Sequence, residues 1–164
     1  MTSPLTGGRK LVVVVSNKLV YVAGNVSGLP ADGVVEFFNG VAAQLRVRGF
    51  KVLVPIRGKY PAYTPGDGCG TMASSIFPAY GVNEIVHRDL NDVDRAGIVL
   101  AFMSEPSIGT SMEILYAREI ARIPVIVVSN NPKVADHYWV RAYASKICAT
   151  QEEAFDELTA WWGY

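Results

Sequence analysis

Short apolar runs alternate with helix-length amphipathic segments along most of this 164-residue chain. The apolar runs have the length of strands, and they lie at 19–23, 51–54, 98–102, 123–128 and 146–148. Between them, apolar residues recur at helical spacing. Strand followed by helix, repeated about five times, predicts a parallel sheet with helices on both faces. We therefore expect a three-layer α/β sandwich with a five-stranded parallel sheet, of flavodoxin-like or Rossmann-like topology.

The same pattern predicts helices and loops at definite places. The expected helices cover 34–48, 82–95, 110–120 and 135–143, with a last helix opened by a capping box of Thr150 and Glu153. Glycine-rich residues 24–33 form a loop, and residues 56–81, rich in proline and glycine, form a long irregular one. Loops of that length are usually functional or disordered. Residues 1–18 read as an N-terminal extension or edge strand, and 19–164 as one domain.

Composition excludes several classes of protein. Fifteen basic residues balance fifteen acidic ones, half of the chain is hydrophobic and 18% is charged. Nucleic-acid binding and intrinsic disorder are therefore disfavoured, and self-association meets no charge repulsion. The aliphatic run 11–15 is too short for a membrane span or a signal segment, so a soluble, cytoplasmic chain is expected. Cys69 and Cys148 make neither a metal pattern nor a disulfide framework.

Ligands of open parallel sheets bind beyond the carboxyl ends of the strands. Two segments meet that condition here, residues 21–28 and 102–113. In the second, Glu113 is expected on the first turn of a helix, whose N-terminus stabilises an ionised carboxylate. Such a carboxylate can act as a nucleophile toward a sugar carbon. The alternative is that Glu113 only favours the start of the helix.

Asp89 is a second candidate acid, 24 residues before Glu113 (113 − 89). Cleavage of a glycosidic bond needs a proton donor as well as a nucleophile. Asp89 lies in the helix that precedes the strand, where it either supplies that proton or is simply part of a solvated helix face.

Three motifs in order carry a family resemblance. They are Tyr21-Val-Ala-Gly24, His87-Arg-Asp89-Leu90, and Ser107-Ile-Gly-Thr110-Ser-Met-Glu113 followed by Ala117 and Ile123-Pro-Val-Ile126. Together they resemble the nucleoside 2-deoxyribosyltransferase family, including the related nucleoside 5′-monophosphate N-glycosidases. The match runs from Leu19 to Val128, about two-thirds of the chain. The order of the motifs is more specific than any one of them.

The resemblance implies double displacement at C1′ of a nucleoside, with no cofactor and no metal. Glu113 would attack the anomeric carbon and form a covalent glycosyl-enzyme, which a second base or water then resolves. Asp89 would assist protonation of the leaving base, and Tyr21 would orient the Glu113 carboxylate. The partners implied are a nucleoside or nucleoside monophosphate and a free nucleobase.

The substrate-binding residues implied are Gly24, Asn25 and Ser27 after the first strand, Ser107 and Gly109 before Glu113, and Asn131. Family transferases generally carry an acid at the position of Ser107, whereas the monophosphate hydrolases tend to carry serine, which favours a nucleotide substrate. Against this, those hydrolases tend to have an arginine where this chain has Ser27. Arg57 or Lys59 could replace that charge, or each could be a surface side chain.

The resemblance also implies a homo-oligomer, a dimer or larger, in which a neighbouring subunit completes each site. Candidate donors are Asn130, Asn131 and the aromatic tail 161–164, although Asn-Asn-Pro is also ordinary turn chemistry. The leading hypothesis is cleavage and transfer of the N-glycosidic bond of 2′-deoxynucleosides. A nucleoside 5′-monophosphate N-glycosidase is the alternative within the same chemistry. A non-catalytic nucleotide-binding module is the alternative from another class.

Overall fold

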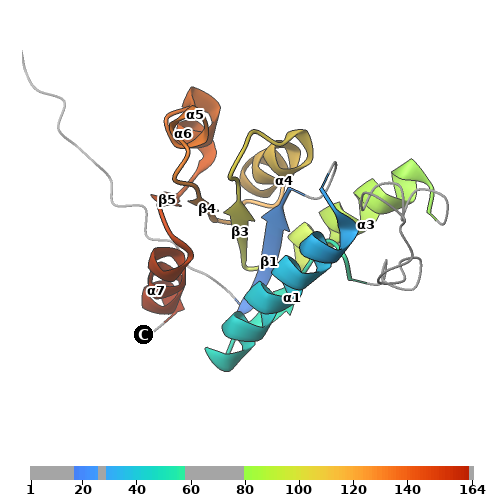
Figure 1. The fold of residues 1–164 in the computed structure, drawn as a ribbon, viewed down its shortest axis with the longest axis horizontal. Helices are drawn as coiled ribbons and strands as arrows, with labels where there is room; N and C mark the ends of the chain where they lie inside the picture. Colours follow the sequence, from blue (N-terminus) through green and yellow to red (C-terminus); the bar gives the residue numbers. More distant parts are fainter. Residues whose placement is uncertain (1–16, 26–28, 58–79, 163–164) are drawn as a thin grey trace, which may run out of the picture.

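The computed structural model describes residues 17–25, 29–57 and 80–162, and its sheet has five parallel strands (Figure 1). The strands are β1 (Leu19–Gly24), β2 (Lys51–Leu53), β3 (Ile98–Phe102), β4 (Val125–Val128) and β5 (Lys146–Cys148). Their order in the sheet is β2-β1-β3-β4-β5. This order is the flavodoxin-like one, so the predicted sheet and topology are confirmed.

Helices cover both faces of the sheet. They are α1 (Ala31–Val47), α3 (Val82–Arg95), α4 (Ile108–Glu119), α5 (Pro132–Ala135), α6 (Tyr138–Tyr143) and α7 (Gln151–Trp162). Alternate side chains of a strand point to opposite faces. Val20 and Val22 therefore pack in the core under α1 and α7, whereas Tyr21 and Ala23 pack in the core under α3, α4, α5 and α6. The three layers of the prediction are present (Figure 1).

Several predicted boundaries were wrong by a few residues. α1 begins at Ala31 instead of 34, because Pro30 takes the N-cap position and Gly33 is accommodated within the helix. The helix predicted at 135–143 is two helices, since His137 adopts an extended backbone and its Nδ1 accepts a hydrogen bond from the Trp139 N–H. The predicted cap of α7 is present, with Thr150 Oγ1 accepting from the Glu153 N–H at 3.2 Å.

Some predictions fall outside the described residues. They concern residues 1–16 of the N-terminal extension, Ser27, Lys59, Cys69, Gly163 and Tyr164, and most of the loop 56–81. In the part of the chain that the structure describes, none of the helices has both the length and the apolar character needed to cross a membrane.

Gly24 ends β1 where the backbone approaches α1 closely. A Cβ atom added there would lie 3.1 Å from Cζ of Phe38, a ring that is completely buried. The ring is held by the surrounding core and has little room to move. Packing of α1 against β1 therefore requires glycine at this position, whatever else Gly24 does.

We expect Gly24→Ala to lower the free energy of unfolding by about 1–3 kcal/mol, the usual cost of overpacking a core. Gly40→Ala is the matched control, because Gly40 lies in α1 with open space around it. Alanine there should raise the stability by about 0.5–1 kcal/mol, since glycine is unfavourable inside helices. Urea denaturation of both variants measures the difference. A Gly24→Ala protein as stable as the wild type would contradict the packing argument.

Candidate active site

The strand order reverses between β1 and β3, which opens a crevice at their carboxyl ends. Gly24 of β1 pairs with Phe102 of β3 in register, so the two strands end side by side. From there the chain enters α1 on one face of the sheet and α4 on the other. The two segments singled out in the sequence therefore begin at neighbouring points.

Tyr21 of β1 and Glu113 of α4 are joined by a hydrogen bond. The Tyr21 hydroxyl donates to Glu113 Oε1 at 2.6 Å, across 92 positions of sequence. This length is typical of a hydroxyl that donates to an ionised carboxylate, which is stronger than a neutral hydrogen bond. Tyr21 is fully buried in the centre of the sheet, so its hydroxyl holds the carboxylate at a fixed place.

The surroundings of Tyr21 keep its hydroxyl protonated. Its pKa is raised well above the ordinary value of 10.0, first by burial and then by the charge of Glu113 and the charge of Asp89. The hydrogen bond to Glu113 and the charge of Asp92 add to this effect. Tyr21 is therefore a hydrogen-bond donor throughout the neutral range, and it lies within the electrostatic reach of all three carboxylates.

Asp89 and Glu113 line the same cavity, which lies between α3 and α4 and has a volume of about 630 Å³. That volume is within the range of roughly 300–1,000 Å³ that small-molecule sites occupy. Most of the wall is apolar, and its other residues are Val86, Leu90, Ile108, Gly109, Met112, Leu115, Tyr116, Glu119 and Ile120. The two candidate acids thus meet at one largely apolar cavity, as a nucleophile and a proton donor would need to.

The position of Glu113 in its helix differs from the prediction. α4 begins at Ile108, with the Ser107 side chain as its N-cap, and its first turn holds no acidic residue. Glu113 lies one turn further along, and the influence of a helix terminus on a charge falls off within the first turn. The predicted place of Glu113 on the first turn of its helix was therefore wrong, and the Tyr21 hydroxyl donates to its carboxylate from β1.

Gly24 and Asn25, the two described residues of the three predicted after β1, do not line this cavity. Asn25 lines a different cavity, of about 280 Å³, at the carboxyl ends of β1, β3 and β4. Phe102, Asn130 and, from α1, Phe37 also line it. Gly24 is buried beneath Phe38. Of the predicted substrate-binding residues, Gly109 lines the cavity of Asp89 and Glu113.

Ser107 and Asn131 make local hydrogen bonds. The Ser107 side chain accepts from the Thr110 N–H at 3.4 Å at the start of α4. Asn131 caps α5 by accepting from the Lys133 N–H at 3.0 Å, and its amide nitrogen donates to the Ser104 carbonyl at 2.8 Å. Asn131 therefore ties the loop after β4 to the loop after β3.

An ion pair between Arg57 and Asp92 was missed by sequence reasoning. One Nη2 atom of Arg57 lies 2.6 and 2.8 Å from the two carboxylate oxygens of Asp92, which is only 5% exposed. Asp92 follows Asp89 by three positions and so shares its face of α3. The spacing of Asp89 and Asp92 could have indicated that Asp92 lies near the site, but it could not have identified Arg57 as the partner of Asp92. The guanidinium considered as a phosphate ligand is thus engaged by a buried carboxylate.

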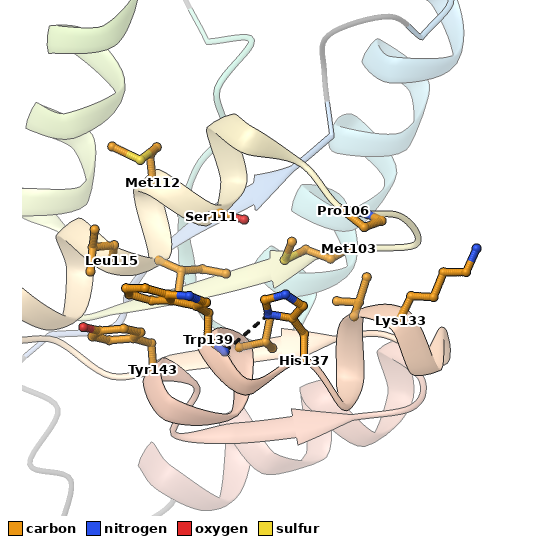
Figure 2. Close-up of a pocket in the computed structure, with 12 residues that line it drawn as sticks. Met103, Pro106, Ser111, Met112, Leu115, Lys133, His137, Trp139 and Tyr143 are labelled. Atoms are coloured by element: carbon orange, nitrogen blue, oxygen red, sulfur yellow. Dashed lines mark hydrogen bonds between the residues drawn. The ribbon is translucent and has the colours of Figure 1, made fainter.

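A third cavity lies on the other side of α4, between that helix and α5–α6, with a volume of about 370 Å³. Figure 2 shows Trp139 and Tyr143 on one side of it and Met112 and Leu115 of α4 on the other. The rings of Trp139 and Tyr143 are stacked, with centroids 5.8 Å apart. Met112 and Leu115 also line the cavity of Asp89 and Glu113, so one helix forms a wall of both cavities.

No group of three side chains arranged as metal ligands occurs among residues 17–25, 29–57 and 80–162. Besides Glu119 and the Tyr116 phenol, the cavity presents the two candidate acids, Asp89 and Glu113, and the buried phenol of Tyr21 donates to Glu113. This arrangement is suited to covalent attack by one carboxylate and proton transfer by the other.

Comparison with known proteins supports the fold. No family model and no curated protein sequence matches the chain. Among solved structures, the 2-deoxyribosyltransferase of Bacillus psychrosaccharolyticus is similar, with a TM-score of 0.57, 16% identity, and coverage of 84% of this chain and 90% of that one. The 2-deoxyribosyltransferase of Leishmania mexicana is also similar, with a TM-score of 0.61, 16% identity, and coverage of 87% and 97%. The chain therefore shares the fold of 2-deoxyribosyltransferases over most of its length.

Proposed function

We propose that this protein cleaves the N-glycosidic bond of 2′-deoxynucleosides and transfers the sugar to a second base, as a member of the nucleoside 2-deoxyribosyltransferase family. The observation that carries the proposal is the Tyr21–Glu113 hydrogen bond at a cavity that Asp89 also lines. The ordered motifs of the sequence and the shared fold support it. No cofactor is needed for this chemistry.

In the first step, a carboxylate oxygen of Glu113 forms a bond to C1′ while the bond from C1′ to the base nitrogen breaks. The electron pair of that bond goes to the base, and Asp89 supplies the proton that the departing base takes up. In the second step, a nitrogen of another base attacks C1′ while the bond from C1′ to Glu113 breaks and frees the carboxylate, and the proton of that nitrogen passes to Asp89, which is thereby restored. The Tyr21 hydroxyl fixes the orientation of the carboxylate for attack and stabilises its charge when it leaves.

A nucleoside 5′-monophosphate N-glycosidase is the second candidate. Ser107 is neutral and begins α4, and Gly109 in the first turn of this helix lines the cavity, where an anion would be favoured. The Arg57–Asp92 ion pair argues the other way, because it engages one of the two cations that the sequence suggested for a phosphate. A non-catalytic nucleotide-binding module would show ligand-induced stabilisation without release of base.

The decisive assay incubates the protein with deoxynucleosides and their 5′-monophosphates, with and without a second base, and follows the bases by chromatography. Transfer predicts a new nucleoside only when a second base is present. Hydrolysis predicts free base and sugar phosphate from a monophosphate alone. Glu113→Ala should lower turnover by roughly 10³-fold or more, the scale seen when a covalent nucleophile is removed.

Glu36→Ala is the matched control for Glu113→Ala, since Glu36 is an exposed acid of α1, on the opposite face of the sheet from this cavity. It should keep wild-type turnover. Undiminished base release by Glu113→Ala would refute the role of Glu113 as nucleophile.

Tyr21→Phe should lower kcat by about 10–100-fold with a smaller change in KM, because a misoriented carboxylate slows the chemical step more than binding. The kinetic prediction is independent of the pKa of Tyr21, which the same variant also tests.

A raised pKa of Tyr21 means that the unfolded chain loses the hydroxyl proton more readily than the folded one as the pH passes 10.0. Denaturation measured at rising pH should therefore show the wild type losing stability relative to Tyr21→Phe above pH 10. An unchanged difference would contradict the burial of a protonated phenol.

The chain is further expected to form a dimer or larger homo-oligomer through α4 and α6. Large apolar side chains are exposed on this surface, among them Ile108, Met112, Tyr138 and Trp139. The cavity between α4 and α6 adds a largely apolar groove (Figure 2). Exposed apolar patches of this kind commonly mark interfaces, and a chain of zero net charge does not repel its copies.

Analytical ultracentrifugation should find an oligomer in the wild type and a shift toward monomer in Tyr138→Lys, because burying a lysine at the interface is unfavourable. Val47→Lys is the control, since Val47 is 88% exposed at the end of α1 on the opposite face of the sheet. It should leave the mass unchanged. A monomeric wild type would contradict the expectation.

A cytoplasmic location stays a prediction from the sequence.

A further inference from the structure

The turn after β2 is attached to α3 at two points on either side of Asp89. Arg88 donates from Nη2 to the carbonyl oxygen of Arg57 at 2.9 Å. Arg57 in turn binds both carboxylate oxygens of Asp92 through its Nη2, at 2.6 and 2.8 Å. Arg88 immediately precedes Asp89, and Asp92 follows it by about one turn. The stretch of helix that carries Asp89 is therefore attached to the turn after β2 on both sides of Asp89.

The carboxylate of this pair is the buried partner. The Asp92 side chain is 8% exposed, whereas the Arg57 side chain is 47% exposed. A buried carboxylate is costly unless a charge pairs with it, so removing the partner is expected to disturb the surroundings. Arg95 also contacts Asp92, at 3.3 Å, but it belongs to the same helix and is 61% exposed. Arg57 is therefore the partner that links α3 to another element.

Asp92 acts on the same phenol as the two proposed catalytic carboxylates. Its charge, like the charges of Asp89 and Glu113, raises the pKa of Tyr21. The charges of three carboxylates, two from α3 and one from α4, thus act on one hydroxyl of β1. Arg57 brings a positive charge to one of them, Asp92, from the turn after β2. Arg88 and Arg95 are the cationic side chains of α3 nearby. Without Arg57, the negative charge of Asp92 would lose the cation that pairs with it from outside α3.

We propose that Arg57 and Asp92 are positioning residues of the reaction, whose ion pair holds Asp89 at the cavity that Glu113 lines and offsets the charge of the third carboxylate. This inference rests on the proposed function. It replaces the alternative in which Arg57 binds a substrate phosphate. A phosphate ligand would affect only phosphorylated substrates, whereas a positioning residue affects every substrate alike.

The test compares Arg57→Met, Arg57→Lys and the matched control Arg95→Met, which removes a cation near Asp92 but no link to β2. Arg57→Met should lower kcat by about 10–100-fold with less than about 3-fold change in KM, on nucleosides and monophosphates alike. The acidic midpoint of its pH–rate profile should move to higher pH. Arg57→Lys should restore the midpoint, because it restores the charge, and Arg95→Met should behave as the wild type in kcat.

A second readout does not depend on catalysis. Hydrogen–deuterium exchange around Asp89, over residues 86–93, should be faster in Arg57→Met than in the wild type and unchanged in Arg95→Met. If Arg57→Met does not fold, Arg57→Met combined with Asp92→Asn removes both charges and carries the same test, since the link to α3 is lost without leaving a charge unpaired.

The outcomes separate the two proposals. If the wild type releases base but the Arg57 variants keep its kcat, pH profile and exchange, the positioning role is wrong and the function stands. A rise in KM confined to monophosphates would likewise overturn it and make Arg57 a phosphate ligand. If the wild type releases no base from any substrate, the proposed function fails. The exchange data then decide whether Arg57 fixes this part of α3.

Discussion

A phenol buried in the central strand of a sheet needs an acceptor, because a buried hydroxyl without one costs about 1–3 kcal/mol. Tyr21 finds it in Glu113, 92 positions away, at 2.6 Å. This one hydrogen bond gives the buried hydroxyl an acceptor, joins β1 to α4, and holds a carboxylate at a cavity. The position of the candidate carboxylate therefore follows from the hydrogen bonding of a buried core residue.

The cores on the two faces of the sheet differ in polarity. The core under α1 and α7 is apolar, with Phe38, Leu45 and Phe155 among its largest buried side chains. The core under α3 and α4 includes Tyr21, and buried Asp92 of α3 acts on its charge state. The buried hydroxyl of Tyr21 and the buried carboxylate of Asp92 are tolerated on this side because Glu113 accepts from the first and Arg57 pairs with the second. The asymmetry places the candidate site between α3 and α4, away from the apolar packing under α1 and α7.

Local charge in this protein is unlike its overall charge. The chain has a net charge of zero, yet three carboxylates act on one phenol. One of the three, Asp92, is paired with Arg57, which arrives from the turn after β2. A neutral composition therefore says little about the electrostatics of the site, which are decided by the few side chains that the fold brings within several ångströms of each other.

The sequence by itself determined the elements and the sheet type. The helix at 82–95 and the strands at 98–102 and 146–148 lie where the pattern predicts them, because periodicity and caps act over three or four residues. The tertiary structure alone decided that Arg57 meets Asp92, that Asn25 lines a cavity separate from that of Glu113, and that Glu113 lies in the second turn of α4. The sequence resemblance implied a role for Tyr21 beside Glu113, but their 2.6 Å contact follows from the strand order. Contacts across 35 or 92 positions depend on which strands become neighbours and which face each helix covers, and no short stretch of sequence contains that information.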